Sequence, residues 1–200
     1  MQALLRSFPM GHSTVQLVCV ISNRLNVEAL QHAKAASVPA FGLPLAEYAS
    51  RADQQAAMAK VLRDAGVELV VLAGYDQILT SEILRPFEGR IVNIHPSLLP
   101  AFAGTLHAQA AALAHGVKVS GCTVHFVIED IDQGPIIAQA AVPVLETDTE
   151  ETLAQRILEQ EHTLLPNVVE WIAEGRVRVE GRRVRIAEGA ANASITQRIR

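Results

Sequence analysis

Apolar runs alternate with amphipathic segments along most of the chain, and this alternation constrains the fold more than any other feature. The runs at 15–22, 68–73 and 90–95 are rich in β-branched residues, as expected of strands that are covered on both faces. Segments with helical spacing follow at 27–37, 52–65, just after 80, and 106–115. The order predicts an α/β fold with a Rossmann-like, mostly parallel sheet and helices on both faces.

The pattern changes after Gly121. Residues 122–128 alternate between apolar and more polar side chains, which predicts a strand with two different faces. A further strand is expected at 136–144 and a long helix at 149–174, in which Pro166 is a candidate bend. The segment 176–186 alternates around Glu180 and Gly181, which predicts a closing β-hairpin. We expect one domain over 1–186 and a tail at 187–200 that is either a frayed helix or disordered.

Composition excludes several classes of protein. Half of the 200 residues are apolar, 19% carry a charge and the net charge is −4, which argues against a broad nucleic-acid-binding surface. No apolar stretch approaches the roughly 20 residues that span a bilayer, and no signal peptide is evident. Cys19 and Cys122 lie in apolar runs without metal-ligand spacing. We therefore expect a cytoplasmic protein without a metal, a membrane or a nucleic-acid partner, as a monomer or homodimer.

Asn93 and His95 form the first candidate cluster. Side chains two positions apart on a strand share a face, and Pro96 ends the strand directly after them. The pair is thus expected at the carboxyl end of a strand, where open α/β sheets bind their ligands. An amide and an imidazole can donate hydrogen bonds to one oxygen and stabilise the oxyanion formed when an amine attacks a carbonyl. Alternatively, both side chains only satisfy the loop after the strand.

The second cluster is His125 with the acidic segment Asp130-Ile-Asp132-Gln-Gly134-Pro135. A loop of this composition is also consistent with an ordinary turn between strands. Beside His95, however, the carboxylate of Asp132 would hold the imidazole's orientation and favour its protonated form.

These residues carry a resemblance to a known family. The runs Asn93-Ile-His-Pro-Ser-Leu-Leu-Pro100 and Gly121-Cys-Thr-Val-His125-Phe-Val-Ile-Glu-Asp-Ile-Asp132-Gln-Gly-Pro135 resemble the signature of formyltransferases that use 10-formyltetrahydrofolate. The similarity to the glycinamide ribonucleotide transformylase branch covers roughly residues 1–185. It continues through Ile21-Ser-Asn23, Leu72-Ala-Gly-Tyr75, Gln160-Glu-His162 and Trp171-Ile-Ala-Glu-Gly-Arg176.

The resemblance implies transfer of the formyl group of 10-formyltetrahydrofolate to the amine of 5'-phosphoribosylglycinamide in purine (IMP) biosynthesis, without a metal. It implies that Asn93 and His95 stabilise the tetrahedral intermediate, with His95 as general acid, and that Asp132 keeps the imidazole charged and helps to pass the proton. Glu161 would accept hydrogen bonds from the ribose hydroxyls. The implied folate-binding residues are Arg51, Asp76, Gln77, Ile78, Leu79 and Asn93. Arg51 and Glu161 are also consistent with solvated charges on helices.

The beginning of the sequence departs from the family. Family members open with a strand and a Gly-x-Gly-Ser-Asn-Leu loop that binds phosphate, whereas Met1-Gln-Ala-Leu-Leu5 matches the family's residues just after that loop. Without the strand, we expect unpaired backbone groups beside its neighbours and a gap over apolar helix faces. A start assigned at an internal Met, a natural fragment, and a partner that supplies the strand are three explanations.

Several functions remain alternatives to the transformylase. A 10-formyltetrahydrofolate hydrolase shares the Asn, His and Asp, but the hydrolases usually carry an N-terminal regulatory domain and a His-His-Ser-Phe-Leu-Pro run instead of His95-Pro-Ser97. A methionyl-tRNA formyltransferase would need a basic RNA-binding domain, and a sugar-nucleotide formyltransferase would need further binding elements. The non-enzymatic alternative is an inactive binding module that resembles a formyltransferase.

Overall fold

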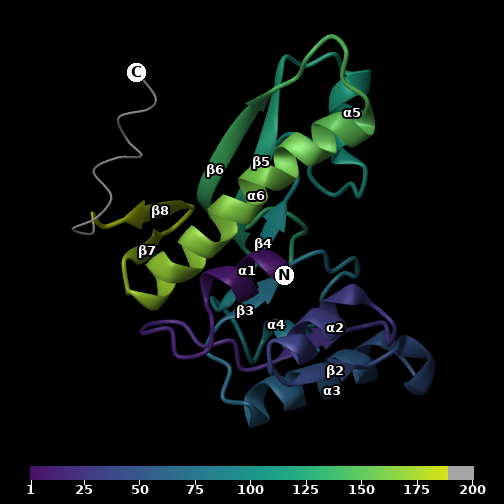
Figure 1. The fold of residues 1–200 in the computed structure, drawn as a ribbon, viewed down its shortest axis with the longest axis vertical. Coiled ribbons are helices and arrows are strands. Elements are labelled where there is room, and N and C mark those ends of the chain that lie inside the picture. Colours follow the sequence, from purple (N-terminus) through teal and green to yellow (C-terminus); the bar gives the residue numbers. More distant parts are fainter. Residues whose placement is uncertain (189–200) are drawn as a thin grey trace.

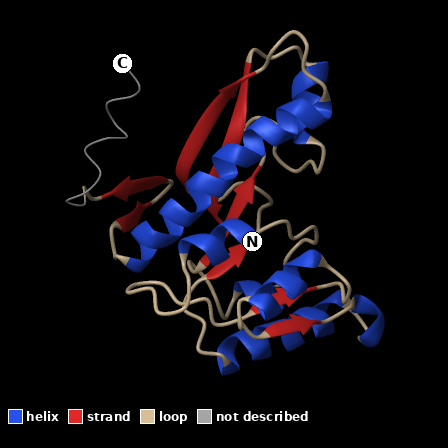
Figure 2. Ribbon diagram, viewed as in Figure 1, coloured by secondary structure: helices blue, strands red, loops and turns tan. Residues whose placement is uncertain are grey.

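A computed structural model describes residues 1–188 of the chain (Figure 1). The helices are α1 (Gln2–Ser7), α2 (Glu28–Ala35), α3 (Arg51–Asp64), α4 (Ser81–Leu84), α5 (Ala108–Ala114) and α6 (Glu150–Ala173), with a 3-10 turn at Leu45–Glu47. The strands are β1 (Val20–Ser22), β2 (Ala40–Gly42), β3 (Val70–Leu72), β4 (Ile91–His95), β5 (Val119–Phe126), β6 (Ile136–Pro143), β7 (Val177–Glu180) and β8 (Arg183–Ile186). Figure 2 shows the alternation of strands and helices that defines the α/β class. The tail expected from residue 187 lies, apart from its first two residues, outside the described part.

The strands form two separate sheets and a hairpin. β1 pairs with β2 in parallel, and a second sheet has the order β3-β4-β5-β6. Within the second sheet, β3 and β4 are parallel, whereas β5 and β6 run antiparallel to their neighbours. β7 and β8 form the hairpin that the sequence predicts. In Figure 1, β2 lies with α2 and α3 in the lower part of the view, and β3 to β6 lie above them.

The expected gap is present between β1 and β3. Each of these strands pairs on one side only, β1 with β2 and β3 with β4. The prediction of strands over 15–22 and 68–73 is wrong in length, because regular pairing covers only Val20–Ser22 and Val70–Leu72. Both strands pair in parallel and along one edge alone, and parallel pairing is slightly less stable per residue than the antiparallel pairing of the longer edge strand β6.

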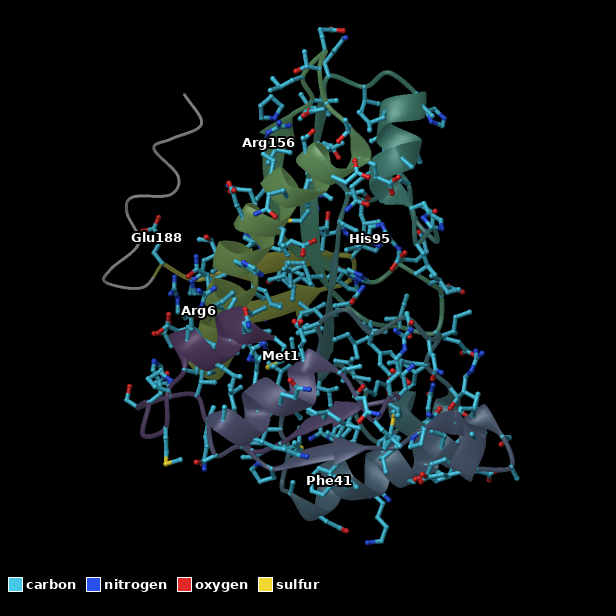
Figure 3. The ribbon with its side chains drawn as sticks, turned by 45° about the vertical axis from the view of Figure 1, so that its right-hand side comes forward. Met1, Arg6, Phe41, His95, Arg156 and Glu188 are labelled. Atoms are coloured by element: carbon cyan, nitrogen blue, oxygen red, sulfur yellow. The ribbon has the colours of Figure 1, made fainter. Side chains whose placement is uncertain are left out.

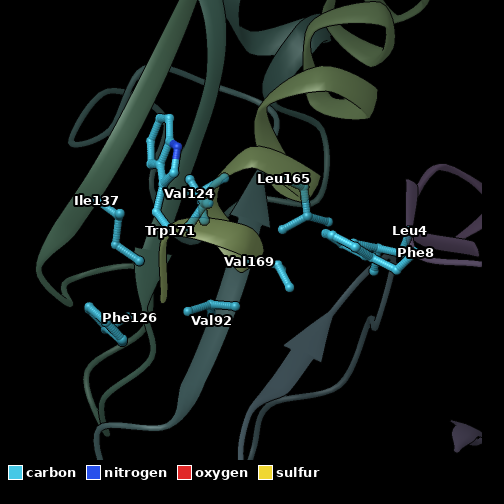
Figure 4. Close-up of a cluster of buried hydrophobic side chains, with 10 residues drawn as sticks. Leu4, Phe8, Val92, Val124, Phe126, Ile137, Leu165, Val169 and Trp171 are labelled. Atoms are coloured by element: carbon cyan, nitrogen blue, oxygen red, sulfur yellow. The ribbon is translucent and has the colours of Figure 1, made fainter. Parts of the chain in front are cut away.

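Three groups of apolar side chains fill the interior. The cluster in Figure 4 joins α1 and α6 to strands β4, β5 and β6, with Leu4, Val92, Val124 and Trp171 among its buried members. A second cluster packs α3 and α4 beneath β1, β3 and β4. A third lies between α5, α6 and the strands β5 and β6. β4 contributes side chains to all three clusters, so packing on both of its faces fixes its carboxyl end.

The long helix α6 is uninterrupted through Pro166. A capping box at its start stabilises the first turn, because the Thr149 hydroxyl accepts a hydrogen bond from the backbone N–H of Thr152 and the Thr152 hydroxyl accepts one from the backbone N–H of Thr149. Gly175, in the left-handed region with φ 69°, follows its end. No helix within residues 1–188 has both the length and the apolar character needed to cross a membrane.

Candidate active site

β4 carries the first two candidate residues to the rim of the sheet. The strand ends at His95 as predicted, and Asn93 lies two positions earlier on the same face. His95 is 6% exposed, so its imidazole is almost completely shielded from water. Nε2 of this ring lies 3.1 Å from the backbone carbonyl oxygen of Phe102, in the loop after β4. A carbonyl only accepts hydrogen bonds, so this contact requires a proton on Nε2.

Asp132 reaches the same rim from the loop after β5. One of its carboxylate oxygens, Oδ2, lies 3.4 Å from Nδ1 of His95 and accepts a hydrogen bond of 2.8 Å from the backbone N–H of Gly104. The side chain is 11% exposed. Both ring nitrogens of His95 thus face oxygen acceptors, an arrangement that matches the doubly protonated imidazole. Asp132 has φ 54°, in the left-handed region that aspartate adopts more readily than most residues other than glycine.

His125 completes the cluster on β5, the strand next to β4. Its Nδ1 lies 2.9 Å from the carbonyl oxygen of Phe126 and therefore carries the proton, which leaves Nε2 to accept from Nδ2 of Asn93 at 3.3 Å. Burial lowers the pKa of His125, although the Phe126 carbonyl and the Asp132 carboxylate oppose that shift. A neutral His125 orients the Asn93 amide and leaves its second N–H group available to another acceptor.

The two faces of β5 differ as the sequence predicts, but both are buried. Cys122 and Val124 contribute to the apolar clusters, whereas Thr123 contacts the loop after β4 and His125 contacts Asn93 of β4. The Thr123 hydroxyl donates to the carbonyl of Ser97 at 2.7 Å and accepts from the N–H of Leu99 at 3.0 Å. This side chain fixes the loop whose later residues contact His95 and Asp132.

The loop after β3 forms a second group of predicted residues at the neighbouring strand end. Buried Gln55, on α3, donates to the carbonyl oxygen of Ile78 at 2.9 Å and accepts from the N–H and the hydroxyl of Thr80 at 2.6 and 3.0 Å. Gln77 accepts from the Tyr75 hydroxyl at 3.1 Å, and Leu79 packs against the α3–α4 cluster. The sequence interpretation missed Gln55. The sequence signal that could have identified Gln55 is a polar residue on the buried face of a predicted helix, one turn before Met58.

Asp76 and Arg51 lie around this loop without contacting His95. Asp76 forms an ion pair with Arg24 and accepts a hydrogen bond of 3.1 Å from Asn23, so it ties the end of β3 to the end of β1. Arg51 is exposed at the first residue of α3. Burial raises the pKa of Tyr75, and the positive charge of Arg51 opposes that rise.

Glu161 borders a cavity on the other side of β4. The cavity has a volume of about 370 Å³ and lies between α6 and the end of the sheet, with Gly74, Ile94, Pro96, Gln109, Gln155 and Glu161 in its wall. Burial raises the pKa of the Glu161 carboxyl, and the amino group of Met1 partly offsets this. Ile94 points to the face of β4 opposite Asn93 and His95, so the cavity and the Asn93–His95–Asp132 cluster lie on the two faces of β4 at its carboxyl end. No group of three or more His, Cys, Asp or Glu side chains with metal-binding geometry occurs within residues 1–188.

An amide, an imidazole and a carboxylate therefore converge at the carboxyl edge of an α/β sheet, and a cavity bordered by Glu151 and Glu161 lies on the opposite face of β4. This arrangement defines a protein equipped to bind a small molecule and to stabilise a negatively charged oxygen. The sequence matches the Formyl transferase family over residues 1–169. The chain belongs to this family.

The relatives narrow the family to one branch. Phosphoribosylglycinamide formyltransferase from Haemophilus influenzae is 37% identical over 180 residues, which cover 90% of this chain and 84% of the relative. The crystal structure of glycinamide ribonucleotide transformylase 1 from Symbiobacterium toebii superimposes with a TM-score of 0.90 at 51% identity, over 94% of this chain and 88% of that one. The chain belongs to the phosphoribosylglycinamide formyltransferase branch.

Longer relatives contain the same region as one part of their sequence. The trifunctional purine biosynthetic protein adenosine-3 from Gallus gallus is 43% identical over 179 residues, or 90% of this chain. The match spans only 18% of that protein's length.

Proposed function

We propose that this chain transfers the formyl group of 10-formyltetrahydrofolate to the amine of 5'-phosphoribosylglycinamide, a reaction of purine biosynthesis. The observation that carries the proposal is the contact of 3.4 Å between His95 and Asp132, beside an Asn93 amide with one N–H group to spare. The proposal also rests on membership in a family whose relatives are named for this transfer.

The chemistry results from the groups at the rim. The substrate amine attacks the formyl carbon, a C–N bond forms, and the carbonyl electrons move to the oxygen. Asn93 and protonated His95 donate hydrogen bonds to that oxyanion. The bond between the formyl carbon and N10 of the folate then breaks, while a proton passes from the attacking nitrogen to N10. His95 supplies or relays this proton, and Asp132 keeps the imidazolium oriented and charged.

The substrate-binding roles are part of the same proposal. The loop of Asp76, Gln77, Ile78 and Leu79 lines the folate site together with Arg51 and Asn93, and Glu161 accepts hydrogen bonds from the ribose hydroxyls. The fixed loop backbone at Ile78 and the cavity beside Glu161 support these roles. We further propose that residues 1–186 act as a single domain, in the cytoplasm, as a monomer or a homodimer.

Formyl release from 10-formyltetrahydrofolate, measured with and without 5'-phosphoribosylglycinamide, tests the proposed function. We expect release that depends on the amine and yields formylated product in equal amount. Release of formate without the amine would instead assign the chain to the hydrolases. Binding of the folate without any release would assign it to the inactive binding modules.

A further inference from the structure

Gln139 lies on the edge strand β6, and its side chain contacts the loop after β4. It is directly opposite Thr123 in the pairing of β5 with β6, so the two side chains share one face of the sheet. Although Gln139 is exposed, its Nε2 donates to the Thr123 hydroxyl at 2.9 Å and to the carbonyl oxygen of Leu99 at 3.0 Å. Leu99 is only 4% exposed, so the Gln139 amide satisfies a carbonyl that is largely shielded from water.

Thr123 cannot take the place of Gln139 at the Leu99 carbonyl. A threonine hydroxyl has one proton to donate and two lone pairs that accept. The Thr123 hydroxyl donates to the carbonyl of Ser97 at 2.7 Å, and it accepts from the N–H of Leu99 and from Gln139. Because its hydrogen-bonding capacity is fully used, Gln139 makes a separate attachment between β6 and the loop.

The attached segment forms a compact turn that leads into Phe102. The Ser97 hydroxyl donates to the carbonyl of Ala101 at 2.6 Å, and the N–H of Ala101 donates to the carbonyl of Leu98 at 3.1 Å. Phe102 follows with φ 57°, a left-handed conformation that a bulky residue keeps only when its surroundings hold it there. The fixed turn provides such surroundings on one side. The edge contact between the rings of Phe102 and His115, with centroids 5.5 Å apart, provides them on the other.

The end of this turn carries two backbone groups that contact the proposed catalytic residues. The Phe102 carbonyl oxygen lies 3.1 Å from Nε2 of His95, and the N–H of Gly104 donates to Asp132 at 2.8 Å. Figure 3 shows His95 near the middle of the molecule, in keeping with its exposure of only 6%. A shift of the loop would therefore disturb the imidazole and the carboxylate together, and a misplacement of about 1 Å can lower a rate about a hundredfold.

We propose that Gln139 is a positioning residue for formyl transfer, because its hydrogen bond to Leu99 fixes the loop that orients His95 and Asp132. The inference rests on the proposed function of the site. Gln139 acts through the loop and not through a substrate, so its loss should lower kcat and leave substrate affinity nearly unchanged. A purely structural role, in which the cross-strand pair of Thr123 and Gln139 only stabilises β5 against β6, predicts lower stability without a specific loss of kcat.

Gln139→Met tests this proposal, because methionine keeps the length of the side chain and removes its N–H donors. We expect hydrogen exchange of the Gly104 amide to accelerate at least about tenfold, whereas exchange of the Val70 amide, which donates to Arg90, should not change. The kcat of transfer to 5'-phosphoribosylglycinamide should fall at least about tenfold, with the folate Kd and the KM of the amine within about threefold of the parent. Gln139→Lys, which keeps an N–H donor, should retain most of the parent's kcat and its slow exchange at Gly104.

Val168→Ala is the control for lost stability, because Val168 is fully buried in the apolar cluster of α1, α6 and the sheet. It should lower Tm and leave both Gly104 exchange and kcat within about twofold of the parent. The proposal is overturned if Gly104 exchange is unchanged in Gln139→Met, if Gln139→Lys loses as much kcat as Gln139→Met, or if Val168→Ala loses kcat to the same extent. A parent chain without transfer activity would refute the proposed function, and Gly104 exchange would still show whether Gln139 fixes the loop.

Discussion

Oδ2 of Asp132 lies 3.4 Å from Nδ1 of His95, although the carboxylate comes from the loop after β5 and the imidazole from the end of β4. The backbone N–H of Gly104 donates to the same oxygen at 2.8 Å. A third segment of the chain thus fixes the carboxylate relative to the ring. Contacts of this kind between separate elements govern both the stability of the protein and its proposed activity.

The stability of the protein should fall in mild acid because of His125. Burial lowers the pKa of this imidazole in the folded protein, whereas a histidine in the unfolded chain titrates near about 6.5. Its contribution is therefore fully present above that pH and is lost as the pH falls, since the unfolded chain takes up the proton more readily. In His125→Asn, the fall in Tm between about pH 7 and pH 5 should be smaller than in the parent. Thermal unfolding measures this, with exposed His115→Asn as the control, and equal slopes would contradict the prediction.

Glu161→Gln should stabilise the free protein near neutral pH and weaken binding of the ribonucleotide. Burial raises the pKa of this carboxyl, so its charged form is unfavourable in the folded state, and stability is lost as the pH rises through the range between its unfolded and folded pKa. We expect Tm to rise by about 1–3 °C at pH 7 and to match the parent below about pH 4. Affinity for 5'-phosphoribosylglycinamide should fall at least tenfold. A variant with unchanged affinity would show that Glu161 does not contact the substrate.

Gln55→Leu should raise the Kd for 10-formyltetrahydrofolate by roughly tenfold and change kcat much less. The side chain holds the backbone around Ile78 and Thr80, and the substitution leaves those groups without their partner. Gln54→Leu is the matched control, because Gln54 is equally buried on α3 but donates to Leu43 outside this loop. If both variants bind folate equally well, the loop has no part in folate binding.

The stability of the protein at low pH should also depend on Asp148. Hydrogen bonds from Arg156 hold the pKa of this carboxyl well below its usual range, and the N–H of Leu145 adds to the effect. Stability from this group is present above the unfolded pKa of about 4 and is lost as the pH falls towards the folded value. Asp148→Asn should lower Tm by several degrees at pH 7. Below pH 4, the difference in Tm between the variant and the parent should be smaller. Thermal unfolding at pH 7 and below pH 4 checks this, and an unchanged Tm at pH 7 would refute it.

Local patterns predict the helices and the strand that ends at His95, because hydrophobic periodicity and Pro96 are readable from neighbouring residues. The lengths of β1 and β3 were not predictable in the same way, since they depend on whether a partner strand lies alongside. The position of Asp132 depends on a left-handed φ and on the Gly104 amide, which no local pattern encodes. The pairing of Asp132 with His95 was predicted from the resemblance to a family, because no local pattern predicts it.

Gly134 is another residue whose structural role could not be predicted from the sequence alone. A side chain at this position would overlap the carbonyl oxygen of Phe126, so only glycine lets the loop that carries Asp132 return close to β5. Sequence alone marks Gly134 as a turn residue, and the structure adds the close approach that requires it.

The proposed mechanism requires that Asp132 act on the reaction through His95. Asp132→Asn is therefore compared with the parent by steady-state transfer to 5'-phosphoribosylglycinamide and by equilibrium binding of the folate, with Asp130→Asn on the same loop as control. We expect kcat to fall at least about a hundredfold in Asp132→Asn while the folate Kd stays within about threefold of the parent. Turnover equal to that of the parent, or a loss explained entirely by weaker folate binding, would contradict this mechanism.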